Sequence, residues 1–298
     1  MMKKLIPLMI CLYGGLLSAQ ENHLYLGETA PDTVPKIFAE GIISKASRSE
    51  FGSVFSADGT TFYFAVNDGG KAEIRYSQWQ KESWTTPKTV IGHAVYSFND
   101  PMLSPDENRL YYISDKPKTG ETPGDYDIWY SEKTGSGWSH PINAGTKINS
   151  EKDEYYISFT ANGTLYFSSN KDAGEGNDNN FDIYASKSVN GEHQEPVRLS
   201  SVINTKYYEA DVFVAPDEAY LIFCSRRPQG LGRGDLYIST KEPNGKWGAA
   251  QHLKKPISTD SHELCPWVTP DGAYFFYTGN QDIYWVSTRI FEQVGQKK

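Results

Sequence analysis

Acidic residues recur at matched points along the chain and could supply acid–base or charge-stabilising chemistry. One set stands six residues before a repeated turn, at Glu50, Phe98, Glu154, Glu209 and Glu263, where only the second copy lacks the glutamate. A second set follows two residues later, at Gly52, Asp100, Tyr156, Asp211 and Cys265. Because side chains alternate along a strand, we expect both sets to point the same way and to bring the carboxylates together.

Two interpretations of these acids stay open. Basic and polar residues are expected at the end of a following strand on the same face, in the pairs Asp115-Lys116, Asn170-Lys171 and Arg226-Arg227. The acids either form ion pairs between neighbouring units or line a pocket, and glycoside hydrolysis requires such a carboxylate pair. The candidate ligand-binding residues are Glu50, Asp100, Glu154, Glu209, Asp211, Glu263, Arg226 and Arg227.

Other reactive residues indicate neither a metal site nor a cofactor. His262 and Cys265 form a His-x-x-Cys pair, but no third and fourth ligands stand at zinc-site spacing. The loop 172–182 resembles a calcium loop only in composition. The glycine-rich stretch 230–234 has no helix after it, so it is not expected to cradle a phosphate. Cys224 and Cys265 are expected to form a disulfide or to stay separate as buried thiols.

A turn flanked by apolar residues recurs five times and organises these side chains. Its copies begin at Ser56, Ser104, Thr160, Ala215 and Thr269, a period of 48 to 56 residues. Proline, aspartate, asparagine and glycine in these copies are typical of tight turns between strands. The first two strands of each unit are therefore predicted on either side of this turn.

A third and a fourth strand complete each unit. The third strand is predicted to open with an acidic residue whose carboxylate accepts backbone N–H groups, at Glu73, Asp127, Asp182, Asp235 and Asp282. The fourth is marked by Trp or Pro, as at Trp84, Trp138, Pro196 and Trp247, and is predicted to end in Ile-Asn or Ile-Ser. Four short strands repeated five times predict an all-β, five-bladed β-propeller.

The ends of the chain indicate how the ring closes. The fifth unit lacks a fourth strand, whereas the segment from Val34 to Ser44 has the pattern of one. We expect this N-terminal strand to complete the last blade, which would remove exposed strand edges. The propeller is therefore predicted over residues 34–290, after a linker at 20–33 and before a tail at 291–298.

The repeat resembles the TolB-like, WD-related β-propeller repeat of bacterial envelope proteins, over roughly residues 34–287. That resemblance implies a periplasmic propeller that acts as a binding platform. The five predicted blades differ from TolB itself, which has six blades and an extra N-terminal domain.

The first 19 residues are predicted to be an export signal. Lys3 and Lys4 precede a short apolar stretch, and Ala19 offers a cleavage site. No later stretch is apolar enough to anchor the chain, so we expect a periplasmic or secreted protein without membrane insertion. A formal charge of −8 argues against a nucleic-acid partner.

The sequence favours a binding platform for an envelope protein or peptide over an enzyme, because it contains no catalytic motif. The alternative is a glycoside hydrolase or lyase that uses carboxylates at the mouth of the propeller channel. Aromatic residues near these acids could stack on a glycan, namely Tyr155, Tyr156, Tyr207, Tyr208 and Trp267.

Overall fold

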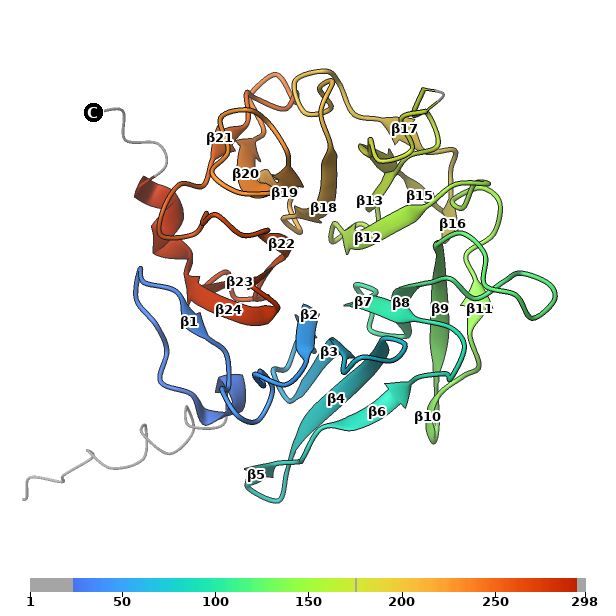
Figure 1. Cartoon of the computed structure of the whole chain (residues 1–298), viewed down its shortest axis with the longest axis vertical. Coiled ribbons are helices and arrows are strands. Elements are labelled where there is room, and N and C mark those ends of the chain that lie inside the picture. Colours follow the sequence, from blue (N-terminus) through green and yellow to red (C-terminus); the bar gives the residue numbers. More distant parts are fainter. Residues whose placement is uncertain (1–23, 175, 294–298) are drawn as a thin grey trace, which may run out of the picture.

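The computed structural model describes residues 24–174 and 176–293 as five antiparallel sheets around a central axis (Figure 1). Blade 1 contains β2 (Ser49–Phe55), β3 (Thr61–Asn67), β4 (Glu73–Gln80) and β6 (Lys88–Ile91). Blade 2 contains β7 (Phe98–Leu103), β8 (Arg109–Ser114), β9 (Asp127–Thr134) and β11 (Ile142–Asn143). Blade 3 contains β12 (Glu154–Phe159), β13 (Leu165–Ser169), β14 (Asp182–Ser186) and β17 (Val197–Arg198).

Blade 4 contains β18 (Glu209–Val214), β19 (Tyr220–Ser225), β20 (Asp235–Thr240) and β21 (Gln251–His252). Blade 5 contains β22 (Leu264–Val268), β23 (Tyr274–Gly279), β24 (Asp282–Ser287) and β1 (Lys36–Ile37). Two-residue strands extend three blades, namely β5 (Ser83–Trp84), β10 (Gly137–Trp138) and the hairpin β15 (Ser188–Val189) with β16 (Glu192–His193). The predicted five-bladed propeller is confirmed, and η2 (Thr288–Gln293) follows the last strand.

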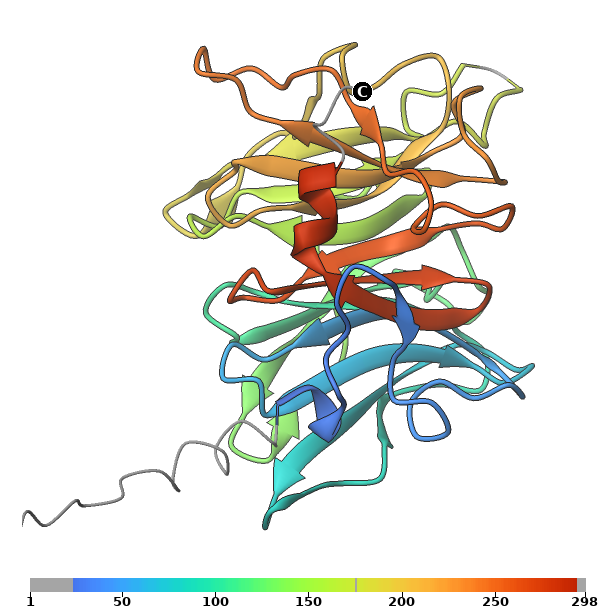
Figure 2. The ribbon, with the colours of Figure 1, turned by 90° about the vertical axis from the view of Figure 1, so that its left-hand side faces the viewer.

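The N-terminal strand closes the ring, as the sequence predicts. β1 pairs with β24, so Lys36 lies opposite Trp285 and Ile37 opposite Tyr284 (Figure 2). The strand is shorter than predicted, because residues 40–44 form turns and bends. The next residue, Phe38, is fully buried, and its ring lies 5.1 Å from those of both Phe62 and Phe276. β1 is therefore attached to blade 5 by strand pairing, and Phe38, which follows it, packs against both blade 5 and blade 1.

The predicted linker is partly attached to the propeller. η1 (Leu24–Gly27) places the ring of Tyr25 4.9 Å from that of Tyr274, and the Tyr25 hydroxyl donates to Asp271 at 3.0 Å. The predicted signal peptide at 1–19 lies outside the described residues, as do residues 294–298 of the predicted tail. Among the described helices, none is long and apolar enough to cross a bilayer.

The repeated turns lie between the first and second strands of every blade, as predicted. In blade 2, Asp106 accepts a hydrogen bond from the Ser104 hydroxyl at 2.6 Å and another from the backbone nitrogen of Asn108 at 3.1 Å. Hydrogen bonds from Ser104 and Asn108 lower the pKa of this carboxyl. A side-chain acceptor two residues into the turn thus satisfies backbone donors that the hairpin leaves unpaired.

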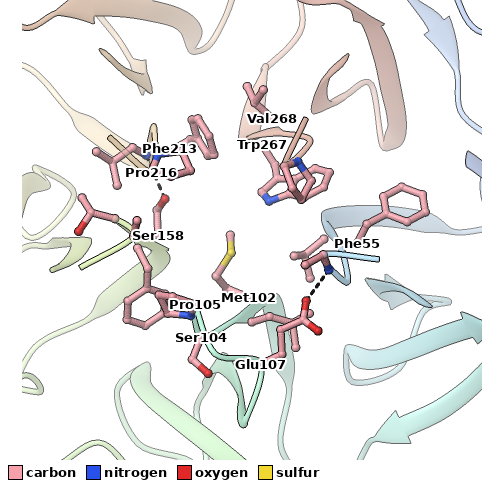
Figure 3. Close-up of a pocket in the computed structure, with 18 residues that line it drawn as sticks. Phe55, Met102, Ser104, Pro105, Glu107, Ser158, Phe213, Pro216, Trp267 and Val268 are labelled. Carbon is pink, nitrogen blue, oxygen red and sulfur yellow. Dashed lines mark hydrogen bonds between the residues drawn. The ribbon is translucent and has the colours of Figure 1, made fainter. Parts of the chain in front are cut away.

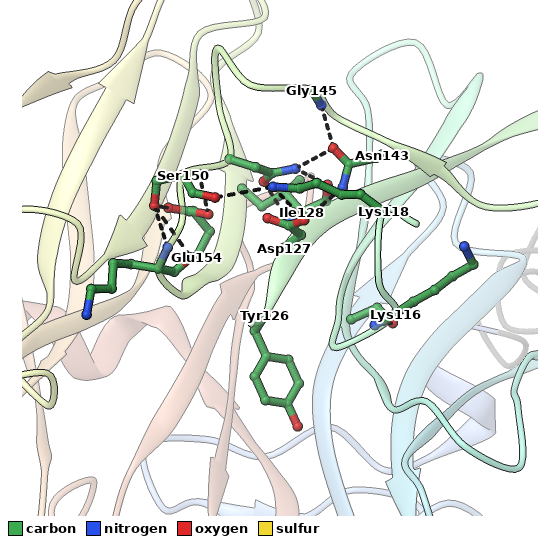
Figure 4. A network of polar contacts seen from close by, with 12 residues as sticks. Lys116, Lys118, Tyr126, Asp127, Ile128, Asn143, Gly145, Ser150 and Glu154 are labelled. Atoms are coloured by element: carbon green, nitrogen blue, oxygen red, sulfur yellow. Dashed lines mark hydrogen bonds and ion pairs between the residues drawn. The ribbon is translucent and has the colours of Figure 1, made fainter. Parts of the chain in front are cut away.

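The acidic residue that opens each third strand is structural, but its partners differ from those predicted. In four blades it bonds to a side chain of the fourth strand, through Thr89, Asn143, Arg198 and His252. Asp127, for example, accepts from Asn143 at 2.9 Å and lies 3.2 Å from Lys118 Nζ (Figure 4). Among the described residues, only Asp235 also accepts backbone N–H bonds from the preceding loop, at Leu231 and Gly232.

The Ile-Asn and Ile-Ser pairs lie beyond the fourth strand, so the prediction that they end it is wrong. The Asn149 side chain accepts from the Ile128 backbone nitrogen at 2.8 Å and donates to its carbonyl at 2.9 Å. Asn204 bonds in the same way to Ile183 in blade 3. A side-chain amide replaces a strand residue here, because it offers the same donor and acceptor as a peptide group.

Candidate functional site

A β-bulge in every innermost strand directs one residue toward the axis. The pairing register shifts within each of these strands, and the bulged residues have left-handed backbone angles. Their φ values are 54° at Gly52, 51° at Asp100, 46° at Tyr156, 52° at Asp211 and 52° at Cys265. We call these five residues the axial ring. Bulges of this kind re-aim side chains and locally disrupt the ladder.

The axial ring is closely packed across blades. Cys265 Sγ donates to Asp100 Oδ1 at 3.4 Å, and the Tyr156 hydroxyl donates to the Pro266 carbonyl at 2.9 Å. A Cβ atom on Gly52 would lie 2.9 Å from Asp100 Cα, so only glycine fits at this point. The axis is therefore filled by side chains at this level.

The two aspartates of the ring are buried and poorly paired. Asp100 is 7% exposed and Asp211 is 8% exposed. Burial raises the pKa of Asp100 to about 6, against a hydrogen bond from Cys265 that lowers it. Burial and the neighbouring charge of Asp100 raise the pKa of Asp211 to about 8, against the opposing charge of Arg226. Within residues 24–174 and 176–293, no hydrogen bond or ion pair reaches the Asp211 carboxylate.

The four glutamates do not share the direction of the axial ring, so the prediction from strand alternation is wrong. Each is buried and accepts bonds from the loop that leads into its own strand. Glu154 accepts from the Ser150 nitrogen at 3.0 Å and hydroxyl at 2.6 Å (Figure 4). Glu263 accepts equivalent bonds from Thr259. The bulge between glutamate and ring residue breaks the period of two, so these acids clamp loops instead of lining the channel mouth.

Ion pairs hold two of the glutamates within a blade, not between blades as one interpretation predicts. Arg48 pairs with Glu50, and Arg227 Nε lies 3.2 Å from Glu209 Oε1. Arg227 also donates to the Ile203 carbonyl at 2.7 Å. Arg226 lies elsewhere, with its guanidinium 4.4 Å from the centre of the Tyr208 ring. Of the eight predicted site residues, Asp100, Asp211 and Arg226 therefore belong to the axial region, and the remaining five are loop clamps.

Aromatic rings adjoin the axial acids on one side. Tyr126, Tyr155, Phe181 and Tyr208 form a chain with ring-centre separations of 5.2, 5.2 and 5.6 Å. Burial raises the pKa of Tyr155, and the charges of nearby acids, Asp100 and Asp211 among them, raise it further. The sequence pattern indicates Tyr155 and Tyr208 but does not indicate Tyr126 and Phe181. The signal that could have found them is an aromatic residue directly before the acidic residue that opens the third strand. It occurs as Tyr126-Asp127 and as Phe181-Asp182.

The opposite end of the axis holds an apolar cavity of about 290 Å³ (Figure 3). All five blades contribute to it through the ends of their innermost strands and the repeated turns. Its main apolar side chains are Phe55, Met102, Phe159, Phe213 and Trp267. Trp267 thus lies in this cavity and not beside the axial acids, where it was expected to stack on a glycan.

The polar groups of this axial cavity already have partners. Ser158 Oγ accepts from the Val214 nitrogen at 2.9 Å, and Glu107 accepts from the Ala57 nitrogen (Figure 3). Ser104 donates to Asp106 within its own turn. The cavity therefore offers mainly apolar contact, because each of these polar groups already makes a hydrogen bond.

The two cysteines of the described residues form no disulfide with each other. Cys224 and Cys265 are both buried free thiols, and burial raises the pKa of each well above its usual range. Cys224 Sγ lies 3.4 Å from His262 Nε2. Burial and the charges of Arg226 and Arg233 lower the pKa of His262 to about 4. In the part of the chain that the structure describes, no group of three or more His, Cys, Asp or Glu residues could hold a metal ion.

No protein-family model and no curated protein sequence matches the chain. Solved structures do match it in fold. TolB from Acinetobacter baumannii is 13% identical over 83% of this chain, with a TM-score of 0.53. The chain spans 56% of that TolB chain.

The likeness to TolB is one of fold. A TolB from Agrobacterium tumefaciens is 16% identical over 80% of this chain and 72% of its own length, with a TM-score of 0.51. A thermostable family-43 glycoside hydrolase is 13% identical over 83% of this chain and 90% of its own length, also with a TM-score of 0.51. At such identities the shared architecture says nothing about which of these activities the chain has.

Proposed function

We propose that this chain is an exported, periplasmic β-propeller that binds an envelope protein or peptide through its axial cavity. The observation that carries the proposal is the apolar cavity built jointly by all five blades, whose polar lining groups are already bonded. Its volume is about 290 Å³. An apolar site of roughly 150 Å³ holds a benzene ring, so one or two large apolar side chains of a partner fit here.

The rim of the cavity suits a protein partner. Exposed turn residues surround the mouth, including Ala161, Pro216 and Pro270. Burial of an aromatic or aliphatic anchor in a central pocket, with exposed turns around it, is the usual arrangement of a binding hot spot. The export signal predicted at residues 1–19 supports a partner in the envelope.

A photo-crosslinking residue in place of Pro216, which is exposed at the mouth of the axial cavity, is expected to capture a specific envelope protein in cells. The same residue at Val197, which is 68% exposed on the outer strand β17, serves as the control. Adducts seen at the rim but not at Val197 are identified by mass spectrometry. Met102→Trp, which fills the cavity, and Pro270→Glu, which places a charge on its rim, should each abolish them. Identical adducts at both positions, or adducts that persist in the folded variants, would contradict the proposal.

A second candidate function, glycan hydrolysis or cleavage, is favoured by one observation. Asp100 and Asp211 are close enough to interact electrostatically, and their pKa values of about 6 and about 8 differ, as an acid–base pair requires. The aromatic chain beside them offers stacking surfaces. Against it, both carboxyl groups are more than nine-tenths buried and neither lines the axial cavity.

Turnover of cell-wall and plant-type oligosaccharides tests this second candidate. If the pair is catalytic, Asp100→Asn and Asp211→Asn should each lower the rate by about 10²–10⁴-fold, as loss of an acid or base does. Asp260→Asn, an exposed substitution in the loop between blades 4 and 5, should leave the rate unchanged. Absence of turnover by the wild-type chain, or equal rates in all three variants, excludes this candidate for the glycans tested.

A further inference from the structure

Neighbouring blades share a repeated aromatic contact at their outer seams. Trp138 of blade 2 packs edge-on against Tyr63 of blade 1, with ring centres 6.3 Å apart and planes at 74°. Trp247 of blade 4 packs in the same way against Tyr166 of blade 3, at 6.5 Å and 84°. Edge-to-face packing at these separations is a favourable arrangement of aromatic rings.

A carboxylate from the repeated turn belongs to the same seam. Glu218 of blade 4 accepts a hydrogen bond from the Tyr166 hydroxyl at 2.8 Å and pairs with Lys241. Lys241 Nζ lies in turn 5.2 Å from the centre of the Trp247 ring. Glu107 holds the equivalent place in the turn of blade 2. The seam between blades 1 and 2 therefore contains Trp138 and Glu107. The seam between blades 3 and 4 contains Trp247 and Glu218.

The seam between blades 2 and 3 lacks both groups. Tyr111 is the equivalent of Tyr63 and Tyr166 in the second strand. His193, the second residue of β16, stands where blade 2 has a tryptophan, and Gly163 stands where the turns of blades 2 and 4 have glutamate. Two smaller residues at one seam leave a groove of about 590 Å³.

The floor of this groove carries aromatic and cationic groups. Arg109 lies 4.5 Å from the centre of the Tyr130 ring, and its only ion pair among the described residues is with the exposed Glu132 at 3.1 Å. Lys133 also lines the groove and is exposed. An exposed pair such as Arg109–Glu132 contributes little and opens readily. The groove thus offers a ligand two contacts: Phe159, whose ring lies 5.0 Å from that of the buried Tyr111, and the partly exposed Arg109 guanidinium.

We propose that this groove, which we call the open seam, binds a partner peptide in which a tryptophan adjoins an acidic residue. The indole lies beside His193, at the position of Trp138 and Trp247 in the other seams, and packs on Phe159, which covers Tyr111. The carboxylate takes the place of Glu107 and Glu218 and pairs with Arg109. Bidentate pairing with a carboxylate and contact with aromatic faces are what an arginine beside a tyrosine provides. The open seam adjoins the axial cavity, since Ser104, Pro105, Phe159 and Ala161 line both. Its proposed contacts with Arg109 and with the space beside His193 lie outside the cavity, so this proposal goes beyond the axial cavity and does not depend on it.

The test uses N-acetyl-Glu-Trp-amide as the probe and the ¹⁵N-labelled full chain. Saturable shifts are expected at the amides of Gly163 and Gly191, with a dissociation constant on the order of millimolar for so small a ligand. N-acetyl-Glu-Ala-amide should not produce them. His193→Trp, which fills the open seam from within, should weaken binding at least about tenfold. Val189→Trp, on the same hairpin but half-exposed outside the groove, should leave it unchanged.

A second variant keeps the test decisive if His193→Trp does not fold. Arg109→Gln changes a partly exposed side chain and should weaken the Glu-Trp probe while leaving N-acetyl-Ala-Trp-amide unaffected. Absence of saturable shifts up to the solubility limit of the probe, or unchanged binding in a folded His193→Trp variant, would overturn the proposal. Neither result affects the crosslinking test at Pro216, because that residue lines the axial cavity and does not line the open seam.

Discussion

Asp211→Asn is expected to stabilise the folded chain above pH 8, by an amount on the order of 3–5 kcal/mol. Burial and the neighbouring Asp100 displace the pKa of Asp211 from 3.8 to about 8, and no described residue bonds to its carboxylate. A tenfold change in an acid constant is worth about 1.4 kcal/mol, so ionising this group in the folded chain is costly. Asparagine has nearly the same shape and carries no charge.

The sign of the pH dependence follows from the same displacement. The unfolded chain releases the Asp211 proton near pH 4, whereas the folded chain keeps it until about pH 8. Between these values the folded state binds more protons, so the free energy of unfolding falls as the pH rises. Asp100, whose pKa is raised to about 6, adds to the fall between about pH 4 and 6. In the Asp211→Asn variant, the free energy of unfolding should not show the part of this fall that extends to pH 8.

Denaturant unfolding at a series of pH values from 4 to 9 measures this effect. Asp260→Asn, an exposed substitution, should change the free energy of unfolding by no more than about 0.5 kcal/mol. A variant less stable than the wild type at pH 8–9 would show instead that the Asp211 carboxylate has a favourable partner in solution.

Phe38→Ala is expected to lower the free energy of unfolding by about 3–5 kcal/mol, the usual cost of removing a buried phenylalanine ring. Phe38 is fully buried beside β1, and its ring meets those of Phe62, Phe276 and Trp285 at 5.1 to 5.4 Å. These partners belong to blades 1 and 5, so the lost contacts are those that join the two ends of the ring. The loss should therefore be measurable as faster hydrogen exchange in β1 and β24.

Val34→Ala is the matched control, because Val34 precedes the same strand and is 67% exposed. Its effect should stay within about 0.5 kcal/mol. If Phe38→Ala destabilised the chain no more than this control, the ring would be held by strand pairing alone.

The two ends of the axis therefore differ in chemistry. One end carries buried acids that lower stability near and above neutral pH, and the other carries an apolar cavity whose polar groups are bonded. Binding of an apolar side chain would use the second end without ionising the first. Neither Asp211 nor Phe38 lines the cavity. The Asp211→Asn and Phe38→Ala variants therefore report on the stability of the folded chain, and not on binding at the rim of the cavity.

Several features could be predicted from the sequence because they depend on neighbours along the chain. The turns at Ser56 and its equivalents, the third strands that open at Glu73 or Asp127, and the N-terminal strand of blade 5 all follow from local patterns. Turn residues and strand alternation act over a few residues, so a repeat in the sequence becomes a repeat in the structure.

The directions of the acidic side chains could not be predicted in this way. Strand alternation predicts that Glu209 and Asp211 point together, yet the bulge between Ala210 and Phe213 separates them. No residue type marks that bulge, since glycine, aspartate, tyrosine and cysteine all occupy its left-handed position. Close packing of five strands around one axis imposes the bulge, and this constraint exists only once the ring has closed.

By itself, then, the sequence determined the five blades, their strand order, the closure by residues near Lys36 and the axial position of Asp100 and Asp211. The tertiary structure alone decided that the four glutamates clamp loops, that Trp267 faces an apolar cavity and that the seam beside Tyr111 stays open. The physical reason is the distance along the chain between the residues that interact. Hydrogen-bonded turns and strands are set by residues close in sequence, whereas cavities, seams and pKa values depend on side chains that only the closed ring brings together.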